Sequence, residues 1–251
     1  MTGKVASIWR YPIKSHGRES LLQTTLKVGH PLPWDRHWAV QHNQSDHDGT
    51  GWVSCQNFMI GARTPELAAL TATLDIENRQ ITLMHNAHGV LTFRPDDNDD
   101  SQRFLTWIRS IIPQQSMYPF RIVSAGERGL TDSTYASVSI MNTASHRAIS
   151  QKLEQPIETE RWRANIWLEE LAPWEEFDWI DQEIRIGTAT LIVRERIERC
   201  LHTAANPWTG KRDINILRLL EDGWHHRDFG VYAEVIHAGT IGIGDSAAVV
   251  S

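Results

Sequence analysis

Short β-type runs that end at glycine, proline or polar turns recur along the chain, and they constrain its fold more than any other feature. Such runs predict strands at residues 4–10, 21–28, 34–41, 74–76, 80–84, 120–124, 136–141, 161–168, 183–186, 189–197, 230–237 and 241–250. Helical patterns cover only residues 65–71, 101–112, 143–153 and 213–222. Many short strands with a few short helices predict a mainly β, barrel-like architecture.

One acidic stretch interrupts this pattern and is the best candidate for a linker. Residues 95–100 read Pro-Asp-Asp-Asn-Asp-Asp, a composition typical of a surface break. We therefore predict two domains, residues 1–95 and 96–251. Ser101 is placed to cap the helix that follows the break, and Thr143 to cap the next helix.

Charge and cysteine content exclude several classes of function. A formal net charge of -6 argues against a nucleic-acid partner held through its phosphates. Two cysteines fit a reducing compartment and are too few for a four-cysteine iron–sulfur cluster. No apolar run reaches the ~20 residues of a membrane span, and the N-terminus lacks the pattern of a signal peptide. We expect a cytoplasmic protein with no membrane partner.

Cys200 is the first candidate for chemistry. It ends the strand predicted at residues 189–197, beside a basic residue, and an Asn-Pro and Thr-Gly loop at residues 206–210 follows it. A thiol at the end of a strand is placed for nucleophilic chemistry or for a soft metal. The alternative is a small buried packing residue, because free cysteine is among the most buried residue types.

Residues 161–167, Arg-Trp-Arg-Ala-Asn-Ile-Trp, form the second candidate stretch. In a strand, alternate side chains share a face, so Arg161, Arg163 and Asn165 are predicted to point the same way. Two guanidinium groups and an amide suit recognition of a phosphate or the edge of a heterocycle. The alternative is an exposed sheet face whose arginines pair with nearby acids.

Two further groups could bind an anion. Lys14 and Ser15 lie on a turn after the first predicted strand, and Arg36 adds a second cation. Asn142 and Thr143 open a helix, where free backbone N–H groups favour phosphate. The alternatives are a solvated turn lysine and a plain helix cap.

Taken together, these motifs resemble those of the MOSC-domain family, named for the C-terminal domain of molybdenum cofactor sulfurase. Residues 11–15 (Tyr-Pro-Ile-Lys-Ser) and 35–38 (Asp-Arg-His-Trp) resemble the signature of the family's N-terminal β domain. Residues 161–166 resemble its Arg-Phe-Arg-Pro-Asn motif. Residues 199–200 and 206–210 resemble its Arg-Cys and Asp-Pro-x-Thr-Gly motifs, and residues 229–232 and 239–245 its closing strands.

The resemblance implies a MOSC-type β-barrel in residues 96–251, preceded by a smaller β-rich domain in residues 1–95. It also implies an enzyme that binds molybdenum cofactor (Mo-molybdopterin) and reduces N-hydroxylated compounds such as hydroxylamines and amidoximes. Cys200 would be the thiolate ligand of molybdenum. The pterin and its phosphate would be held by Lys14, Ser15, Arg36, Arg161, Arg163 and Asn165, with Thr143 and Ser145 near the helix start.

Three positions depart from the family pattern, and they affect the substrate more than the cofactor. Ala164 replaces the usual proline, Asn206 replaces the usual aspartate, and His202 lies two residues after Cys200. No Gly-x-Gly-x-x-Gly nicotinamide motif follows a strand. We therefore expect electrons to come from a separate protein. We also expect the protein to be a monomer. A sulfur carrier with a persulfide on Cys200, and a cofactor-storage protein without turnover, remain as alternatives.

Overall fold

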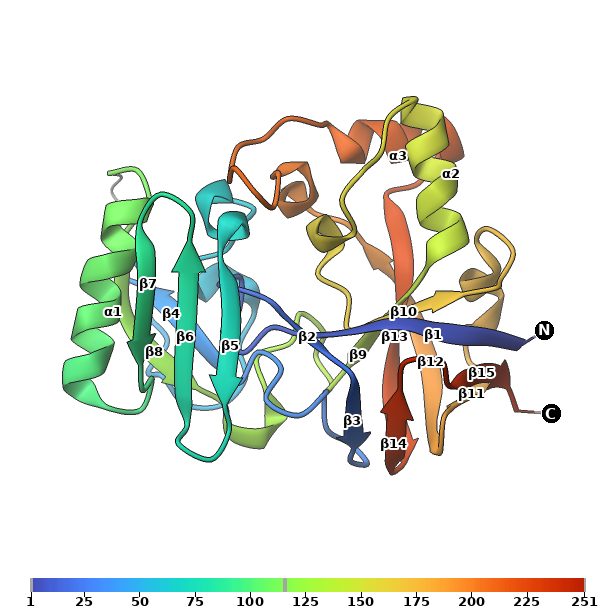
Figure 1. Cartoon of the computed structure of the whole chain (residues 1–251), viewed down its shortest axis with the longest axis horizontal. Helices are drawn as coiled ribbons and strands as arrows, with labels where there is room; N and C mark the ends of the chain where they lie inside the picture. Colours follow the sequence, from blue (N-terminus) through green and yellow to red (C-terminus); the bar gives the residue numbers. More distant parts are fainter. Residues whose placement is uncertain (1, 115–116, 251) are drawn as a thin grey trace.

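The computed structural model describes residues 2–114 and 117–250 and is mainly β (Figure 1). Its strands are β1 (Thr2–Arg10), β2 (Glu19–Leu21), β3 (Gln23–Leu26), β4 (Trp38–His42), β5 (Thr71–Asp75), β6 (Gln80–His85), β7 (Gly89–Phe93), β8 (Pro119–Ser124), β9 (Val138–Asn142), β10 (Ile166–Glu169), β11 (Glu183–Ile186), β12 (Ala189–Glu198), β13 (Asp228–His237), β14 (Gly239–Gly242) and β15 (Ser246–Val249). The α-helices of the described residues are α1 (Asn98–Ile111), α2 (Thr143–Leu153) and α3 (Ile216–Trp224). Short 3-10 helices are η1 (Cys55–Asn57), η2 (Pro65–Ala69), η3 (Gly126–Arg128), η4 (Thr159–Trp162), η5 (Glu175–Trp179) and η6 (Leu201–Ala204).

Seven strands close into a barrel, which confirms the predicted fold class. Their order is β10-β9-β13-β12-β11-β15-β1, and β1 pairs back onto β10. The β10–β9 pair is parallel, whereas β1 is antiparallel to both of its barrel neighbours. Closure leaves none of these strands with a free edge inside the ring. Thr2 of β1 pairs with Ala248 of β15, so the two ends of the chain meet in one sheet.

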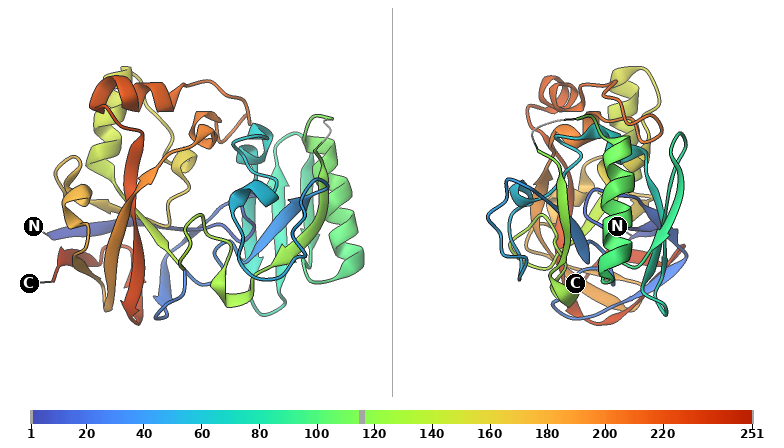
Figure 2. Two further views of the ribbon diagram at one scale, coloured as in Figure 1. Left: turned by 180° about the vertical axis from the view of Figure 1, so that it is seen from behind. Right: turned by 90° about the vertical axis from the view of Figure 1, so that its left-hand side faces the viewer.

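Alternation of side chains along the strands builds the barrel core. In β12, Leu191 and Val193 are fully buried, whereas Arg194 is exposed. Buried side chains of β1 and β13, including Ile8 and Val231, join them in one hydrophobic cluster. Burying each such side chain stabilises the fold by roughly 1.5–3 kcal/mol. Helices α2 and α3 lie beside each other at one end of the barrel (Figures 1 and 2).

The N-terminal half has its own hydrophobic core. Strands β5, β6 and β7 form an antiparallel sheet, β4 pairs with β8, and α1 packs on β7 and β8 (Figure 2). The rings of Phe93 and Phe104 stack with centroids 4.6 Å apart, and Ile81 and Ile108 belong to the same cluster. The hairpin predicted from residues 74–84 is β5–β6, and that prediction is confirmed.

Two predicted helix caps are wrong by one to four residues. Helix α1 begins at Asn98, and the carboxylate of Asp97, rather than Ser101, accepts a hydrogen bond from the N–H of Asp100. Helix α2 is capped by Asn142, whose side chain accepts from the N–H of Ala144, and Thr143 is its first helical residue. The domain boundary at residues 95–96 stays a prediction, and α1 just after it packs on strands of the N-terminal half.

The strand predicted over residues 161–168 is also wrong in its first half. Residues Thr159–Trp162 form η4, Arg163 has left-handed backbone with φ of 51°, and β10 starts only at Ile166. The physical reason is local, because Arg161 forms an ion pair with Glu158 three residues earlier at 2.6 Å. A helical turn brings such residues together, whereas an extended strand separates them.

In the described part of the chain, no helix is both long enough and apolar enough to cross a membrane.

The packing of α1 gives a prediction for stability. Phe104→Ala removes a fully buried ring that stacks on Phe93, and we expect it to lower the free energy of unfolding by ~3–5 kcal/mol. Thr106→Ala, at an exposed position of the same helix, is the control and should change it by less than about 1 kcal/mol. Urea denaturation measures both, and equal effects would contradict the packing of α1.

Candidate functional site

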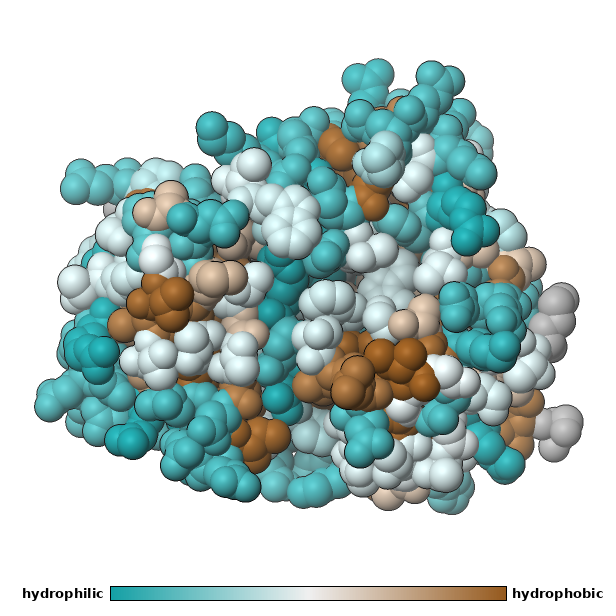
Figure 3. Space-filling view, in the orientation of Figure 1, coloured by the Kyte–Doolittle hydropathy of each residue, from teal (hydrophilic) through white to brown (hydrophobic). Residues whose placement is uncertain are grey.

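A pocket of about 260 Å³ lies between the two halves of the chain. The N-terminal half contributes Lys14, Ser15, Arg36, Cys55 and residues 60–62, and the barrel half contributes Asp132, Ser139, Arg163, Arg199, Cys200, His202 and Tyr232. The structure therefore brings five predicted site residues together: Lys14, Ser15, Arg36, Arg163 and Cys200. In the space-filling view, hydrophilic residues run along the boundary between the halves on the face shown (Figure 3).

Cys200 lies where the sequence predicts it, just beyond the end of a barrel strand. Strand β12 ends at Glu198, and η6 begins at Leu201. The carbonyl of Cys200 accepts hydrogen bonds from the N–H and the hydroxyl of Thr203, at 3.2 and 3.0 Å, which hold the turn. The thiol is free and exposed, so it is available to a ligand in the pocket.

Lys14 is buried and already paired. Its ammonium donates to the carbonyl oxygen of Leu130 at 2.7 Å and to Asp132 at 2.5 Å. The side chain of Asp132 is 47% exposed, and although its partial desolvation would raise the pKa, Lys14 and Arg36 lower the pKa to about 2. Asp132 and Glu198 are thus the two acidic residues of a pocket that also holds several cations, and nothing in the sequence singled out Asp132.

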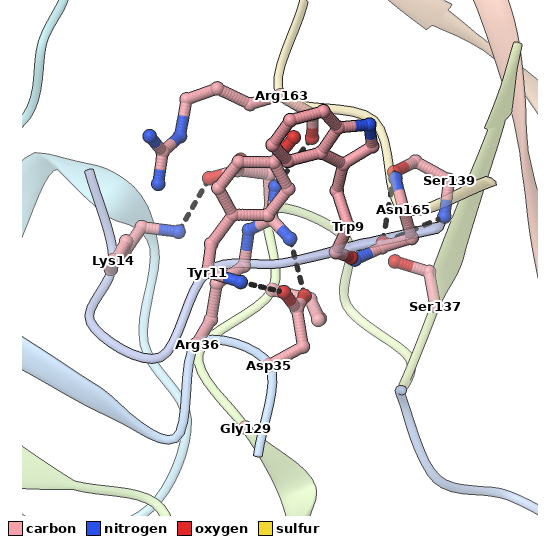
Figure 4. Close-up of polar contacts among 12 residues, drawn as sticks. Trp9, Tyr11, Lys14, Asp35, Arg36, Gly129, Ser137, Ser139, Arg163 and Asn165 are labelled. Atoms are coloured by element: carbon pink, nitrogen blue, oxygen red, sulfur yellow. Dashed lines mark hydrogen bonds and ion pairs between the residues drawn. The ribbon is translucent and has the colours of Figure 1, made fainter. Parts of the chain in front are cut away.

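Arg36 lines the pocket and belongs to a joint between the two halves. We use this name for Tyr11, Asp35 and Arg36 together with the backbone carbonyls of Arg163 and Ala164 that they contact (Figure 4). The carboxylate of Asp35 accepts from the Tyr11 N–H at 2.8 Å and from the Arg36 guanidinium. Arg36 also donates to the carbonyl of Arg163 at 3.0 Å, and the Tyr11 hydroxyl donates to the carbonyl of Ala164 at 2.9 Å. Burial alone would lower the pKa of Arg36, but Asp35 and Asp132 raise it, so the cation persists.

The guanidinium of Arg163 lies over the Tyr11 ring, 4.2 Å from its centroid, and donates to the carbonyl of Gly17 at 3.2 Å. Burial lowers the pKa of Arg163 to about 9, and the neighbouring Arg36 also lowers it. The group therefore stays charged at neutral pH. A nearby anion would relieve both burial and repulsion.

Three non-glycine residues of the pocket have left-handed backbone. The φ angles are 64° at Ser15, 51° at Arg36 and 51° at Arg163. Such conformations are uncommon outside glycine, and they cluster at sites where the surrounding structure fixes them. Their coincidence around one pocket is independent support for a functional site there.

Asn165 does not line the pocket itself but holds two strands of the barrel wall beside it. Its side-chain oxygen accepts from the N–H and hydroxyl of Ser139 at 3.1 and 2.9 Å, and its amide group donates to the Trp9 carbonyl at 3.2 Å (Figure 4). These bonds join β1 to β9. Ser139 lines the pocket, so Asn165 fixes a wall of the site.

The other three predicted residues lie outside this pocket. Arg161 forms ion pairs with Glu158 and Asp213 and donates to the Ala204 carbonyl at 3.2 Å. Ser145, near the start of α2, donates to Glu176 at 2.9 Å, and Thr143 precedes it. The structure places none of the three among the pocket walls.

Two basic side chains beside Cys200 complete the site. Arg199 is half-buried, its desolvation lowers its pKa, and it donates to the Trp162 carbonyl at 2.5 Å. Burial, and then Arg163 and Arg199, lower the pKa of His202 to about 3, so its imidazole is neutral at pH 7. The position of Arg199 beside Cys200 was its signal in the sequence, and Tyr232 lies in the stretch 229–232 that resembles a closing strand of the family, but neither was predicted as a site residue.

Two family models and one curated relative match this chain. A model described as the MOSC domain matches residues 127–248, and one described as the MOSC N-terminal beta barrel domain matches residues 2–116. Mitochondrial amidoxime-reducing component 1 of Mus musculus is 23% identical over 290 residues, covering 97% of this chain and 81% of that protein.

The similarity to solved structures is lower. The YuaD protein from Bacillus subtilis has a TM-score of 0.46 at 12% identity, covering 98% of this chain and 94% of that one. YiiM from Geobacillus stearothermophilus has a TM-score of 0.35 at 17% identity, covering 45% and 54%.

The joint at Asp35 gives the next prediction. Asp35→Ala leaves Arg36 buried without its acceptor, and removing one partner of a buried pair typically costs ~3–5 kcal/mol of unfolding free energy. Asp35→Asn keeps an oxygen that can accept from the Tyr11 N–H and should cost less. Asp46→Ala, at an exposed position, is the control. Thermal and urea unfolding that rank the three variants otherwise would contradict the role of the joint.

Proposed function

Because the chain belongs to the MOSC-domain family, we propose that it binds molybdenum cofactor and uses it to reduce N-hydroxylated compounds. The observation that carries the proposal is the exposed thiol of Cys200 in a pocket lined by four cationic side chains, Lys14, Arg36, Arg163 and Arg199. Amidoxime reduction is the activity named for the mouse relative, and this chain resembles that protein over nearly its whole length.

The residues of the pocket fit such a cofactor by their chemistry. A thiolate is a soft ligand that suits molybdenum, and guanidinium groups suit a dianionic phosphate. The volume of about 260 Å³ lies just below the ~300–1,000 Å³ that is typical of small-molecule sites. Lys14 is held by Asp132 at 2.5 Å, so it must exchange that partner to reach an anion.

Each residue has a distinct part in the proposed reaction. Cys200 would ligate the metal, and Arg36, Arg163, Lys14 and Ser15 would hold the pterin and its phosphate. Asp35 and Tyr11 keep the arginines in place through the bonds of the joint. When bound, molybdenum cofactor supplies two-electron redox chemistry at its metal. Reduction of R–NHOH to R–NH2 consumes two electrons and two protons and releases water, with the electrons supplied by a separate donor protein.

A second candidate function uses the same thiol in another way. An exposed Cys200 could carry a persulfide sulfur, and Cys55 lines the same pocket as a second thiol. Burial and then Asp132 raise the pKa of Cys55, which disfavours its thiolate and weakens this reading. Cofactor binding without turnover is the third outcome that the experiments distinguish.

The pair of thiols offers a matched test of the ligand. We expect Cys200→Ser to keep the fold and lose nearly all bound molybdenum, whereas Cys55→Ser keeps it. Protein from cells that make the cofactor is analysed for metal by mass spectrometry and for folding by circular dichroism. Equal molybdenum in wild type and Cys200→Ser would sink the assignment, and an added sulfur mass on Cys200 would favour the carrier.

The activity itself is tested on molybdenum-loaded protein. We expect reduction of benzamidoxime and of a hydroxylamine with a reduced viologen dye as donor, and little with NADH alone. The Cys200→Ser variant is the control and should be inactive. Loaded protein that accepts electrons from the dye, yet leaves both compounds unchanged, would point to carriage or storage of the cofactor.

A further inference from the structure

His202 is a buried imidazole in the pocket, two residues beyond Cys200. Its residue is 8% exposed, and it lines the cavity. Among residues 2–114 and 117–250, no side chain or backbone group forms a hydrogen bond with its ring. Because His202 lines the pocket, its ring nitrogens can bind a group that enters there.

The position of the ring is fixed from both halves of the chain. On the barrel side, the His202 carbonyl accepts from the N–H of Ala205 at 3.0 Å in the turn of η6. On the other side, the ring packs on Gly61, where a Cβ atom would lie 1.8 Å from its Nδ1. Only glycine permits this approach, so His202 and Gly61 form a narrow contact across the pocket, beside Cys200.

We propose that His202 binds the substrate directly and favours amidoximes over simple hydroxylamines, an inference that rests on the proposed function. A neutral imidazole offers one donor and one acceptor nitrogen. An amidoxime carries an amino group beside its N–OH, and the amino group can donate to the acceptor nitrogen. A simple hydroxylamine lacks that second nitrogen and gains less from the contact.

The cations of the pocket cannot accept this hydrogen bond. Ammonium and guanidinium groups donate hydrogen bonds and do not accept them, which excludes Lys14, Arg36 and Arg163 as acceptors. Two carboxyl groups, Asp132 and Glu198, also line the pocket and can accept. His202 adds an acceptor nitrogen two residues beyond the thiol that would hold the metal.

Steady-state kinetics of loaded protein test the proposal with benzamidoxime and N-phenylhydroxylamine. His202→Leu should raise KM for benzamidoxime about three- to tenfold, the effect of one lost hydrogen bond, with kcat changed little. KM for N-phenylhydroxylamine should change about twofold or less. His202→Asn, which keeps an acceptor, should restore part of the selectivity. His237→Leu, at an exposed position of β13, is the control for loss of a histidine.

Gly61→Ala provides an independent variant, because its methyl group must displace the His202 ring. We expect the same rise in KM for benzamidoxime without any change at position 202. Molybdenum content and melting temperature are measured for each variant, so that loss of cofactor or fold is separated from loss of substrate binding. If His202→Leu does not fold, His202→Asn and Gly61→Ala test the proposal in its place. If the ratio of the KM values for benzamidoxime and N-phenylhydroxylamine equals the wild-type ratio in both variants, the proposal is overturned.

Binding without turnover separates this inference from the proposed function. Isothermal titration calorimetry with benzamidoxime and oxidised, loaded protein in the absence of reductant gives Kd directly. A Kd that rises about three- to tenfold in His202→Leu supports the contact, and an equal Kd overturns it. A wild type that binds benzamidoxime but reduces neither compound would refute the reductase function and leave the His202 contact standing.

Discussion

The buried carboxylate of Asp35 is the interaction on which the rest of the site depends. It accepts from the Tyr11 N–H and from Arg36, and these two residues then reach across to the carbonyls of Ala164 and Arg163 in the barrel half. A single carboxylate therefore orders the segment that carries Lys14, the turn that carries Arg36 and the irregular backbone before β10. Without it, the two halves would still each have a core, but Arg36 would lose the carboxylate that holds it.

The charges in the pocket explain why its cationic side chains must be held in fixed positions. Arg36, Arg163 and Arg199 are all withdrawn from water, and burial of a cation is unfavourable unless it is paired. Asp35 and Asp132 compensate part of this positive charge. The pKa of Arg163 is still lowered, by burial and by the neighbouring Arg36, so its positive charge is only partly compensated. An excess of buried positive charge at fixed positions is the condition under which an anion binds strongly, because the protein is already ordered before the ligand arrives.

The sequence predicted the barrel and five of the residues that line the pocket, and its failures have local causes. Period-2 patterns located β12 and hence Cys200, because one face of that strand is buried and the other is not. Arg161 was misplaced, since the strand pattern hides its pairing with Glu158, and that pair turns the chain into η4. Asp132 could not be found, because a loop residue 118 positions from its partner Lys14 leaves no periodic signal.

The division of the site between two halves has a thermodynamic consequence. A ligand that binds only the assembled pocket stabilises the assembled chain by mass action. Lys14 and Arg36 come from one half, and Arg163, Arg199 and Cys200 from the other, so neither half alone can supply both the thiol and the full set of cations. Binding in the pocket and packing of the halves are then linked, and the Asp35 joint is the element through which each affects the other.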